Sequence, residues 1–181
     1  VDSKTGVCLT CEYQLTAGVS GVGTAKYFDN IDDAFTAALS EENSGCTLTL
    51  YKDCELSQNI VIGNATLTVD VNGHSISPEI RGIDVNDGGV LYLKNSGENG
   101  SIGLEMAVNK GGTLINGTAD DSSSAVSLFA VTADAAECVE FYGGSCTYLT
   151  IKNGTSGIAL YGGYYDIICG SLTDNTPCLL Y

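Results

Sequence analysis

Basic residues are scarce in this chain. Of its 181 residues, 7 are Lys or Arg and 22 are Asp or Glu, which gives a formal net charge of −15. Nucleic-acid binding needs a basic footprint, and an anionic membrane surface attracts clusters of Lys and Arg. We therefore expect neither nucleic acid nor an anionic membrane among the partners, and we interpret the charge as a means of keeping the chain soluble.

Proline and histidine are rarer still, with 2 and 1 residues. A zinc ribbon built on the C-x-x-C at Cys8–Cys11 needs a second C-x-x-C or a His pair at suitable spacing, but the next cysteines are far away and His74 is the only histidine. That motif also lacks the βαβ context of a redox site. The segment Asp84–Gly88 resembles part of a calcium loop, but no glutamate follows at the required place. We expect no metal centre and no cofactor.

Long apolar runs are absent as well. No stretch approaches the roughly 20 apolar residues that a membrane-spanning helix needs, and no signal-peptide pattern begins at Val1. We expect no membrane insertion. The chain begins and stops abruptly, with Leu179–Tyr181 still patterned as a strand. We therefore expect a single domain that is monomeric within a longer protein.

Cysteine is plentiful, in contrast, and its count is even. An even number favours disulfides and an extracellular setting, although eight cysteines allow 105 connectivities. Proximity in the sequence suggests Cys8–Cys11, Cys46–Cys54, Cys138–Cys146 and Cys169–Cys178. The alternative is that several of the eight are buried thiols that pack as small apolar groups. The sequence leaves both interpretations open.

Three short runs in the middle of the chain repeat one pattern. The runs at 65–71, 89–94 and 112–116 alternate apolar and polar residues, and a Gly-containing turn precedes each. Their leucines, Leu67, Leu91 and Leu114, lie 24 and 23 residues apart. An imperfect repeat of strands at that period predicts a β-solenoid, in which each turn of the chain stacks on the one before.

One segment has helical periodicity instead. Between 29 and 42, an apolar stripe recurs at i, i+3, i+4, i+7 and i+8, from Ile31 to Leu39. Asn30 suits the N-cap, and Asn43–Gly45 suits the end of the helix. A single amphipathic helix before a strand stack could cover the apolar end of the first coil.

The predicted fold is therefore all-β: a right-handed parallel β-helix with one N-terminal capping α-helix. We expect residues 1–26 to form an irregular lead-in that contains cysteines, and residues 27–181 to form the helix and the β-helix as a single domain. Strand alternation assigns twelve side chains to the core. They are Leu48, Leu50, Leu67, Val69, Val71, Leu91, Leu93, Leu114, Val139, Phe141, Leu149 and Ile151.

A family resemblance supports this fold. The segments Gly45–Asp53 and Leu67–Ile76, together with the helix at 27–35 and the lead-in Gly6–Cys11, resemble the right-handed β-helix domains of large secreted or cell-surface proteins of gut Firmicutes. The resemblance covers residues 6 to 165. It implies a non-catalytic, adhesin-like role outside the cell. Some proteins of this kind bind immunoglobulin variable regions in the manner of superantigens.

We therefore expect a surface-exposed module that binds a host protein, with the immunoglobulin variable region as the leading candidate. One alternative is a structural spacer within a surface adhesin. A further alternative is a domain that binds or cleaves a polysaccharide. Cleavage needs acidic residues that converge on one face, and the acidic pairs Asp32–Asp33, Glu41–Glu42 and Asp120–Asp121 do not fall at matching positions of neighbouring coils. We expect no catalytic residue and no enzyme.

Two surfaces are candidates for ligand binding. The first is a group of tyrosines in the last third of the chain: Tyr142, Tyr148, Tyr161, Tyr164 and Tyr165. Exposed tyrosines anchor ligands at small entropic cost, although tyrosine is also simply a good strand former. The second is an outward, partly apolar strip made by Val90, Tyr92 and Ile115.

Overall fold

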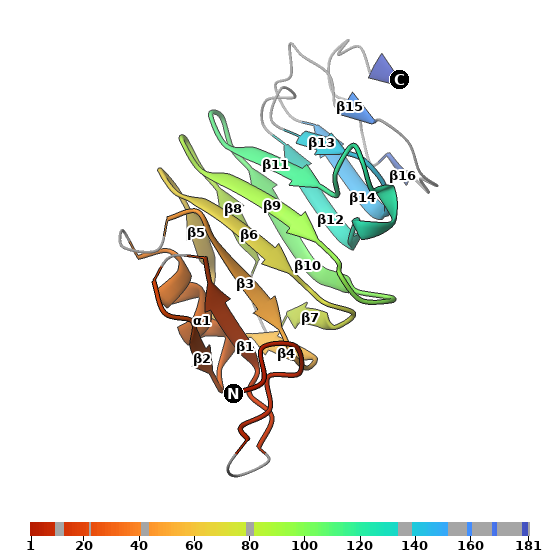
Figure 1. The fold of residues 1–181 in the computed structure, drawn as a ribbon. Coiled ribbons are helices and arrows are strands. Elements are labelled where there is room, and N and C mark those ends of the chain that lie inside the picture. The colour runs from red at the N-terminus through yellow and green to blue at the C-terminus, as the bar shows by residue number, and fades with distance from the viewer. Residues whose placement is uncertain are drawn as a thin grey trace.

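The chain folds as an all-β solenoid of stacked parallel strands, as a computed structural model shows (Figure 1). The structure describes residues 1–9, 13–21, 23–40, 44–78, 82–133, 139–151, 159–160, 168–169 and 179–180. Successive coils advance steadily from the N-terminal end to the C-terminal end of the stack. The β-solenoid predicted from the repeats is confirmed, and its right-handedness stays a prediction.

Two sheets form the walls of the solenoid. The nine-stranded sheet runs, in spatial order, β2 (Lys26–Phe28), β1 (Ala17–Ser20), β3 (Cys46–Leu50), β6 (Thr66–Asp70), β9 (Val90–Lys94), β11 (Thr113–Asn116), β13 (Val139–Phe141), β15 (Ala159–Leu160) and β17 (Leu179–Leu180). The eight-stranded sheet consists of β4 (Cys54–Leu56), β7 (Ser75–Pro78), β10 (Ser101–Val108), β12 (Ser127–Ala133), β14 (Ser145–Ile151) and β16 (Ile168–Cys169), with β5 (Ile60–Ile62) and β8 (Ile83–Val85) beside them. A short 3-10 turn, Ser122–Ser124, lies in the corner loop before β12.

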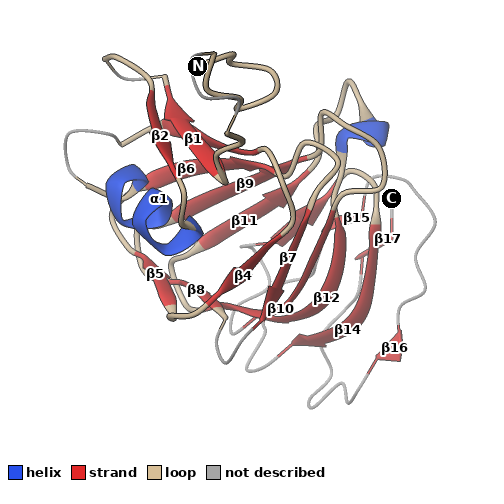
Figure 2. Cartoon of the chain, turned by 90° about the horizontal axis from the view of Figure 1, so that it is seen from below, coloured by secondary structure: helices blue, strands red, loops and turns tan. Residues whose placement is uncertain are grey.

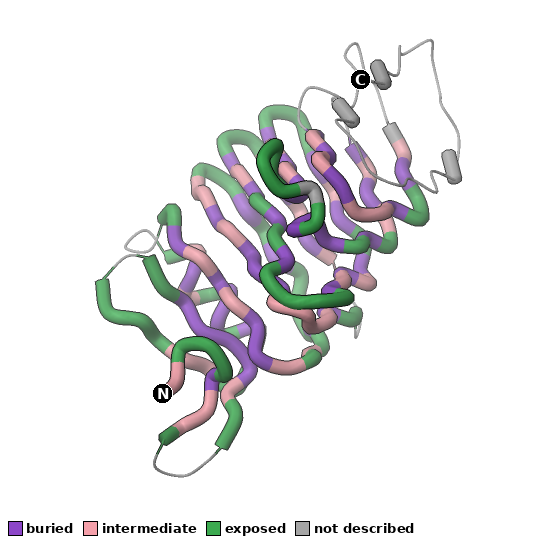
Figure 3. The backbone as a smooth tube through the Cα atoms, turned by 45° about the vertical axis from the view of Figure 1, so that its right-hand side comes forward, coloured by how far each residue is buried: buried purple, intermediate pink, exposed green. Residues whose placement is uncertain are grey.

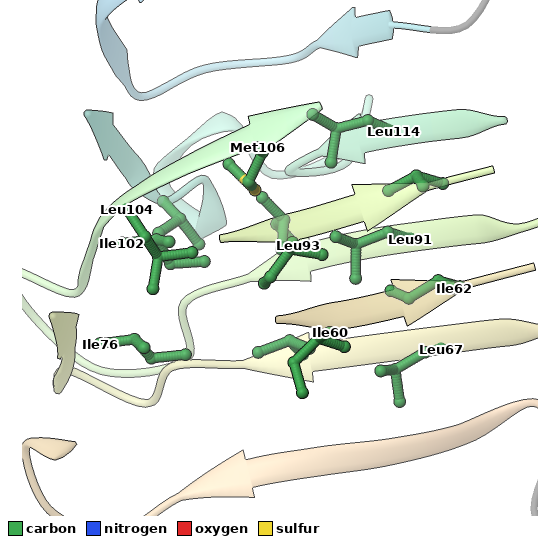
Figure 4. Packing of buried hydrophobic residues seen from close by; sticks show 14 of the residues in the cluster. Ile60, Ile62, Leu67, Ile76, Leu91, Leu93, Ile102, Leu104, Met106 and Leu114 are labelled. Carbon is green, nitrogen blue, oxygen red and sulfur yellow. The ribbon is translucent and has the colours of Figure 1, made fainter. Parts of the chain in front are cut away.

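The core is a set of apolar ladders between the sheets. Leu91 of β9 lies opposite Leu67 of β6 on one side and Leu114 of β11 on the other, and all three side chains are fully buried. Ile62 lies beside these leucines, whereas Ile76 and Ile102 belong to the same buried cluster but lie farther along the coil, beyond Leu93, as Figure 4 shows for the middle of the stack. Eleven of the twelve predicted core side chains are buried. The twelfth, Ile151, is one whose side chain the structure does not describe.

The corners between strands also stack. Asn64, Gly88 and Gly111 precede β6, β9 and β11, and all three have positive φ, at 53°, 72° and 81°. Such a backbone is easy only for Gly and tolerable for Asn, which explains why the turn before each repeat has this composition. Figure 3 shows exposed corners joined by strands in which buried residues alternate with less buried ones.

Asn72 organises a corner on the other side of the coil. Its φ is 48°, and its side-chain amide donates a 3.0 Å hydrogen bond to the carbonyl oxygen of Leu50 in the preceding coil. The expectation that this side chain satisfies backbone groups at the corner is confirmed. The neighbouring His74 lies 3.7 Å from a carboxylate oxygen of Asp53 at the same corner.

The helix α1 spans Ile31–Ala38, which is shorter than the predicted 29–42. Asn30 is its N-cap, as expected, and accepts a hydrogen bond from the backbone N–H of Asp32. The helix ends early because Leu39 leaves helical geometry while still packing against the core, so the apolar stripe outlasts the helix. Figure 2 shows α1 at the N-terminal end of the stack, where it contacts β1–β4. Its role as a cap stays a prediction.

The expected irregular lead-in at 1–26 is wrong in one respect, because residues 17–20 form β1 inside the nine-stranded sheet. This strand pairs antiparallel with both β2 and β3, so the sheet is not wholly parallel at its N-terminal end. The sequence did not predict β1 because Gly18, in its middle, is a weak strand former. Gly18 lies under an aromatic ring, and a Cβ there would sit 2.9 Å from the Tyr51 hydroxyl. The close packing of the Tyr51 and Tyr27 side chains against this position favours a small residue, despite the weak strand preference of glycine.

Candidate functional site

Only two of the five predicted tyrosines lie among residues that the structure describes. Tyr161, Tyr164 and Tyr165 fall outside them. Tyr142 follows β13 in the nine-stranded sheet, is half-buried, and donates a 2.9 Å hydrogen bond from its hydroxyl to Glu140 Oε2. Tyr148 belongs to β14 in the eight-stranded sheet and is 46% exposed. The two tyrosines therefore belong to different sheets.

Tyr148 has an aromatic partner that sequence reasoning missed. Phe129 of β12, 43% exposed, meets it edge to face with 5.3 Å between the ring centroids. Edge-to-face contact is a favoured arrangement of two rings, so the pair holds a defined orientation on the surface. Large exposed aromatic side chains held in place in this way are typical anchors of binding surfaces.

The rings face outward because strand alternation breaks at this point. In β12, Leu128 and Val131 are buried, so the two residues between them both face outward; in β14, Cys146 and Leu149 enclose Thr147 and Tyr148 in the same way. The break lies in register across the two strands, with Leu128 opposite Cys146 and Ala130 opposite Tyr148. A spacing of i, i+3 between inward apolar residues is the signal that could have revealed Phe129.

The break continues a corner of the earlier coils. There the same place separates two strands: residues 57–59 lie between β4 and β5, and β7 ends at Pro78 before β8 begins at Ile83. The longer β10 pairs with β7 through Ile102 and with β8 from Met106 onward, so it spans both strands. The aromatic pair on β12 and β14 stands where this corner continues beyond β10.

A groove of about 520 Å³ lies on this corner, next to the aromatic pair. Its lining residues, apart from any outside the described ranges, are Asn59, Pro78, Gly82, Asp84, Gly103, Leu104, Glu105, Met106, Ala107, Phe129 and Thr132. That volume is within the range of small-ligand sites, which run from about 300 to 1,000 Å³. Phe129 belongs to both the groove and the aromatic pair, which joins them into one surface.

Asn59 fixes one wall of the groove. Its amide nitrogen donates a 2.7 Å hydrogen bond to Asp84 Oδ2, and its Oδ1 accepts one of 3.3 Å from the backbone N–H of Gly82. The segment Asp84–Gly88 resembles part of a calcium loop in sequence. In the structure it begins on strand β8 and ends in a turn. In the part of the chain that the structure describes, no three His, Cys, Asp or Glu side chains gather as a metal site would require.

The second candidate surface lies on strands β6, β9 and β11, and these strands pair in the register that the repeats predict. Thr68, Tyr92 and Ile115 lie opposite one another on β6, β9 and β11, and Val90 stands beside them. Tyr92 is 39% exposed, whereas Val90 and Ile115 are half-buried. This strip is on the outward face of the nine-stranded sheet, and Tyr92 is its most prominent apolar side chain.

The acidic pair Asp32–Asp33 has a structural role through its first member. Asp32 is buried, and its carboxylate accepts hydrogen bonds from the backbone N–H of Ser57 and Gln58 and from the Ser57 hydroxyl, which is 2.6 Å away. These bonds tie the start of α1 to the corner between β4 and β5. Asp121 likewise accepts hydrogen bonds from Ser123, which lower the pKa of its carboxyl group.

Cys46, Cys54 and Cys146 are thiols. Cys46 and Cys54, which proximity in the sequence pairs, are both free, so the proposed Cys46–Cys54 disulfide is wrong. Cys46 Sγ lies 3.5 Å from the carbonyl oxygen of Ala38, and Cys54 Sγ lies 3.9 Å from that of Ser75, each as a donor. Cys46 and Cys146 are buried, whereas Cys54 is half-buried. The supposed partners Cys11, Cys138 and Cys178 lie outside the described residues.

Burial disfavours the thiolate form of Cys54 and Cys146. It raises the pKa of Cys54 to about 12 and that of Cys146 to about 11. At pH 8 both are protonated, and the thiolate is the form that attacks a disulfide reagent. We expect Cys54 and Cys146 to react with Ellman's reagent at least tenfold more slowly in the native chain than in urea. Equal rates, measured with peptide mapping of the labelled sites, would contradict the buried-thiol assignment.

The fold and this corner define the class of the protein: a β-solenoid that presents an aromatic pair beside a groove of mixed polar and apolar lining. Comparison with known proteins finds no matching family model, no matching curated protein and no matching solved structure. Among the described residues, no helix is long and apolar enough to cross a membrane.

Proposed function

We propose that this chain is a non-catalytic binding module of a secreted or cell-surface protein, and that it binds a host protein through the corner of its eight-stranded sheet. The observation that carries the proposal is the exposed edge-to-face pair of Phe129 and Tyr148. Aromatic side chains dominate the energetics of protein interfaces because they bury a large area with few rotatable bonds. Neighbouring strands of a stacked sheet give this pair a firm support.

The resemblance to β-helix domains of gut Firmicutes makes the immunoglobulin variable region the first ligand to test. Its framework surface is a folded protein face, and such partners are bound through aromatic anchors surrounded by polar groups. A spacer role is the alternative, since stacked coils alone are sufficient to hold other domains apart. A neutral polysaccharide would also find hydroxyl-binding groups in the groove at Asn59, Asp84 and Glu105.

The test is binding of polyclonal human Fab fragments to the immobilised chain. We expect Tyr148→Ala and Phe129→Ala each to weaken binding at least tenfold, because removing an interface anchor typically costs about 2 kcal/mol or more. The matched control is Tyr92→Ala, which removes an exposed aromatic side chain from the other sheet and should leave affinity unchanged. A thermal melt of each variant checks that the fold is intact.

Three other outcomes redirect the proposal. If the Tyr148 and Phe129 variants bind like the parent while Tyr92→Ala does not, the site is the strip of Val90, Tyr92 and Ile115. If neither Fab nor any protein of serum or mucus binds, the spacer role replaces the binding role. If polysaccharide is captured or shortened instead, the carbohydrate alternative replaces both.

A further inference from the structure

Asparagine is followed by glycine at four places in the chain: Asn72–Gly73, Asn99–Gly100, Asn116–Gly117 and Asn153–Gly154. Such a pair can lose the asparagine amide without an enzyme, because the nitrogen of glycine attacks the asparagine Cγ with no side chain to hinder it. A hydrogen bond that holds this nitrogen or the amide opposes the attack, since that bond must first be broken. The structure describes the first three pairs, so their protection from this reaction can be compared.

The stack holds both reacting groups of Asn116–Gly117. The Asn116 side chain is buried, donates a 2.9 Å hydrogen bond from its amide nitrogen to the carbonyl oxygen of Val126, and accepts one of 2.9 Å from the Val126 N–H. The N–H of Gly117 donates to the carbonyl oxygen of Leu93 in the preceding coil, at 2.9 Å. The reaction at Asn116 would have to break all of these bonds away from water.

Asn72–Gly73 is only half-buried, but it is held in the same way. The Asn72 amide nitrogen donates a 3.0 Å hydrogen bond to the carbonyl oxygen of Leu50, and its Oδ1 accepts one of 3.2 Å from the Ser96 hydroxyl. The N–H of Gly73 donates to Asn95 Oδ1 at 2.8 Å. Hydrogen bonds to the coils on both sides therefore oppose the reaction at Asn72.

Asn99–Gly100 differs from both of these pairs. Asn99 is exposed in the loop between β9 and β10, where it has a φ of 59°. Among the described residues, its side chain has no hydrogen-bond partner and the N–H of Gly100 has no acceptor. The amide is therefore free to turn towards the nitrogen of Gly100, and no hydrogen bond has to break before the attack.

We propose that Asn99 is a site of spontaneous deamidation, and that its isoaspartate product loosens the start of β10. The Gly100 nitrogen forms a bond to Asn99 Cγ while the bond from Cγ to Nδ2 breaks, and the proton of the attacking nitrogen leaves with Nδ2 as ammonia. The succinimide ring contains only atoms of Asn99 and that nitrogen, so it closes without displacing Gly100 Cα. Water then opens the ring, at Cγ to give aspartate or at the main-chain carbonyl carbon to give isoaspartate. This chemistry belongs to the chain alone and does not depend on the proposed function.

Isoaspartate adds one carbon to the main chain just before a tightly packed residue. Gly100 is buried, and a Cβ there would lie 2.4 Å from Val71 Cγ2. Its carbonyl oxygen accepts a 3.3 Å hydrogen bond from the N–H of Ser127, and the N–H of Ser101 donates to the carbonyl oxygen of His74 at 3.1 Å. Because a close-packed interior leaves little room for a longer main chain, the product should weaken the pairing of β10 with β7 and β12.

The rate of deamidation tests the first half of the proposal. The chain is incubated at pH 8 and 37 °C, natively and in urea, and each site is followed by peptide mapping with mass spectrometry. In urea the Asn–Gly pairs should react at similar rates, because the fold no longer distinguishes them. In the native chain we expect Asn99 to react within about threefold of its urea rate, and Asn72 and Asn116 at least tenfold more slowly than theirs. Native Asn99 that is protected as strongly as Asn72 and Asn116 would overturn the proposal.

Two variants test the second half. Asn99→Gly keeps the positive φ and removes the amide, and Asn99→Asp adds the charge of the aspartate product without lengthening the main chain. After the same native incubation, we expect the parent to melt at least about 2 °C below both variants, once isoaspartate has accumulated. A parent that has formed isoaspartate at Asn99 and still melts with the two variants would show that β10 tolerates the product, which refutes the loosening.

Discussion

Replacing Leu91 by alanine is expected to lower the free energy of unfolding by about 2–5 kcal/mol, the range found when a buried leucine is truncated. Leu91 is fully buried, and it lies between Leu67 and Leu114 in adjacent coils. The neighbouring strands are hydrogen-bonded on both sides of β9, so the coils cannot easily close on the space left behind. The loss should therefore fall in the middle of this range or above.

Urea unfolding of the parent and the variant measures the effect, and Tyr92→Ala is the control. Tyr92 is the next residue of the same strand, but its side chain points outward and is 39% exposed. Its truncation should cost less than about 1 kcal/mol, as surface substitutions generally do. A loss below about 1 kcal/mol for Leu91→Ala would mean that the strand register described above is wrong.

The sequence was sufficient to predict the solenoid because its signals are local and repeated. Leu67, Leu91 and Leu114 recur at nearly one period, and glycine or asparagine recurs at the corner before each strand. Stacking converts that period directly into contacts between like positions, as the paired registers of β6, β9 and β11 show. The Asn30 cap was equally readable, since a single side chain determines it.

The candidate site was less predictable because it depends on an irregularity. Two adjacent residues face outward in β12 and again in β14, and strict alternation cannot place both. Tyr148 was assigned to the surface correctly, but Phe129 was missed. The groove depends on Gly82 and Gly103, whose small size matters only because of which strand each one faces. No local pattern carries that information.

The cysteine pairing failed for a related reason. Cys46 and Cys54 lie eight positions apart, but Cys46 opens a strand of one sheet and Cys54 opens a strand of the other. Proximity along the chain is a poor guide to proximity in space when each coil turns a corner between the two residues. The alternative interpretation, that several cysteines are buried apolar thiols, describes Cys46 and Cys146.

The second large effect is expected at the N-terminal end of the stack. Phe35 of α1 is fully buried against the core, and α1 contacts both β1 and β3. In Phe35→Asp a carboxylate would have to be buried without a partner, which costs several kcal/mol in an apolar setting. If α1 caps the first coil, it should detach instead, exposing the apolar ends of the ladders. We expect the variant to aggregate, because exposed strand edges and apolar surface recruit other chains.

Size-exclusion chromatography with light scattering measures the association, and a thermal melt measures the stability. The matched control is Thr36→Asp, which adds the same charge one residue later on the exposed side of the helix. Thr36 donates its hydroxyl to the carbonyl oxygen of Asp32, a bond that is already redundant with the helix, so little stability should be lost. A Phe35→Asp chain that stays monomeric and melts with the parent would show that the solenoid needs no cap at this end. Aggregation of Phe35→Asp alone, with Thr36→Asp monomeric, would instead place the cap on the buried face of α1.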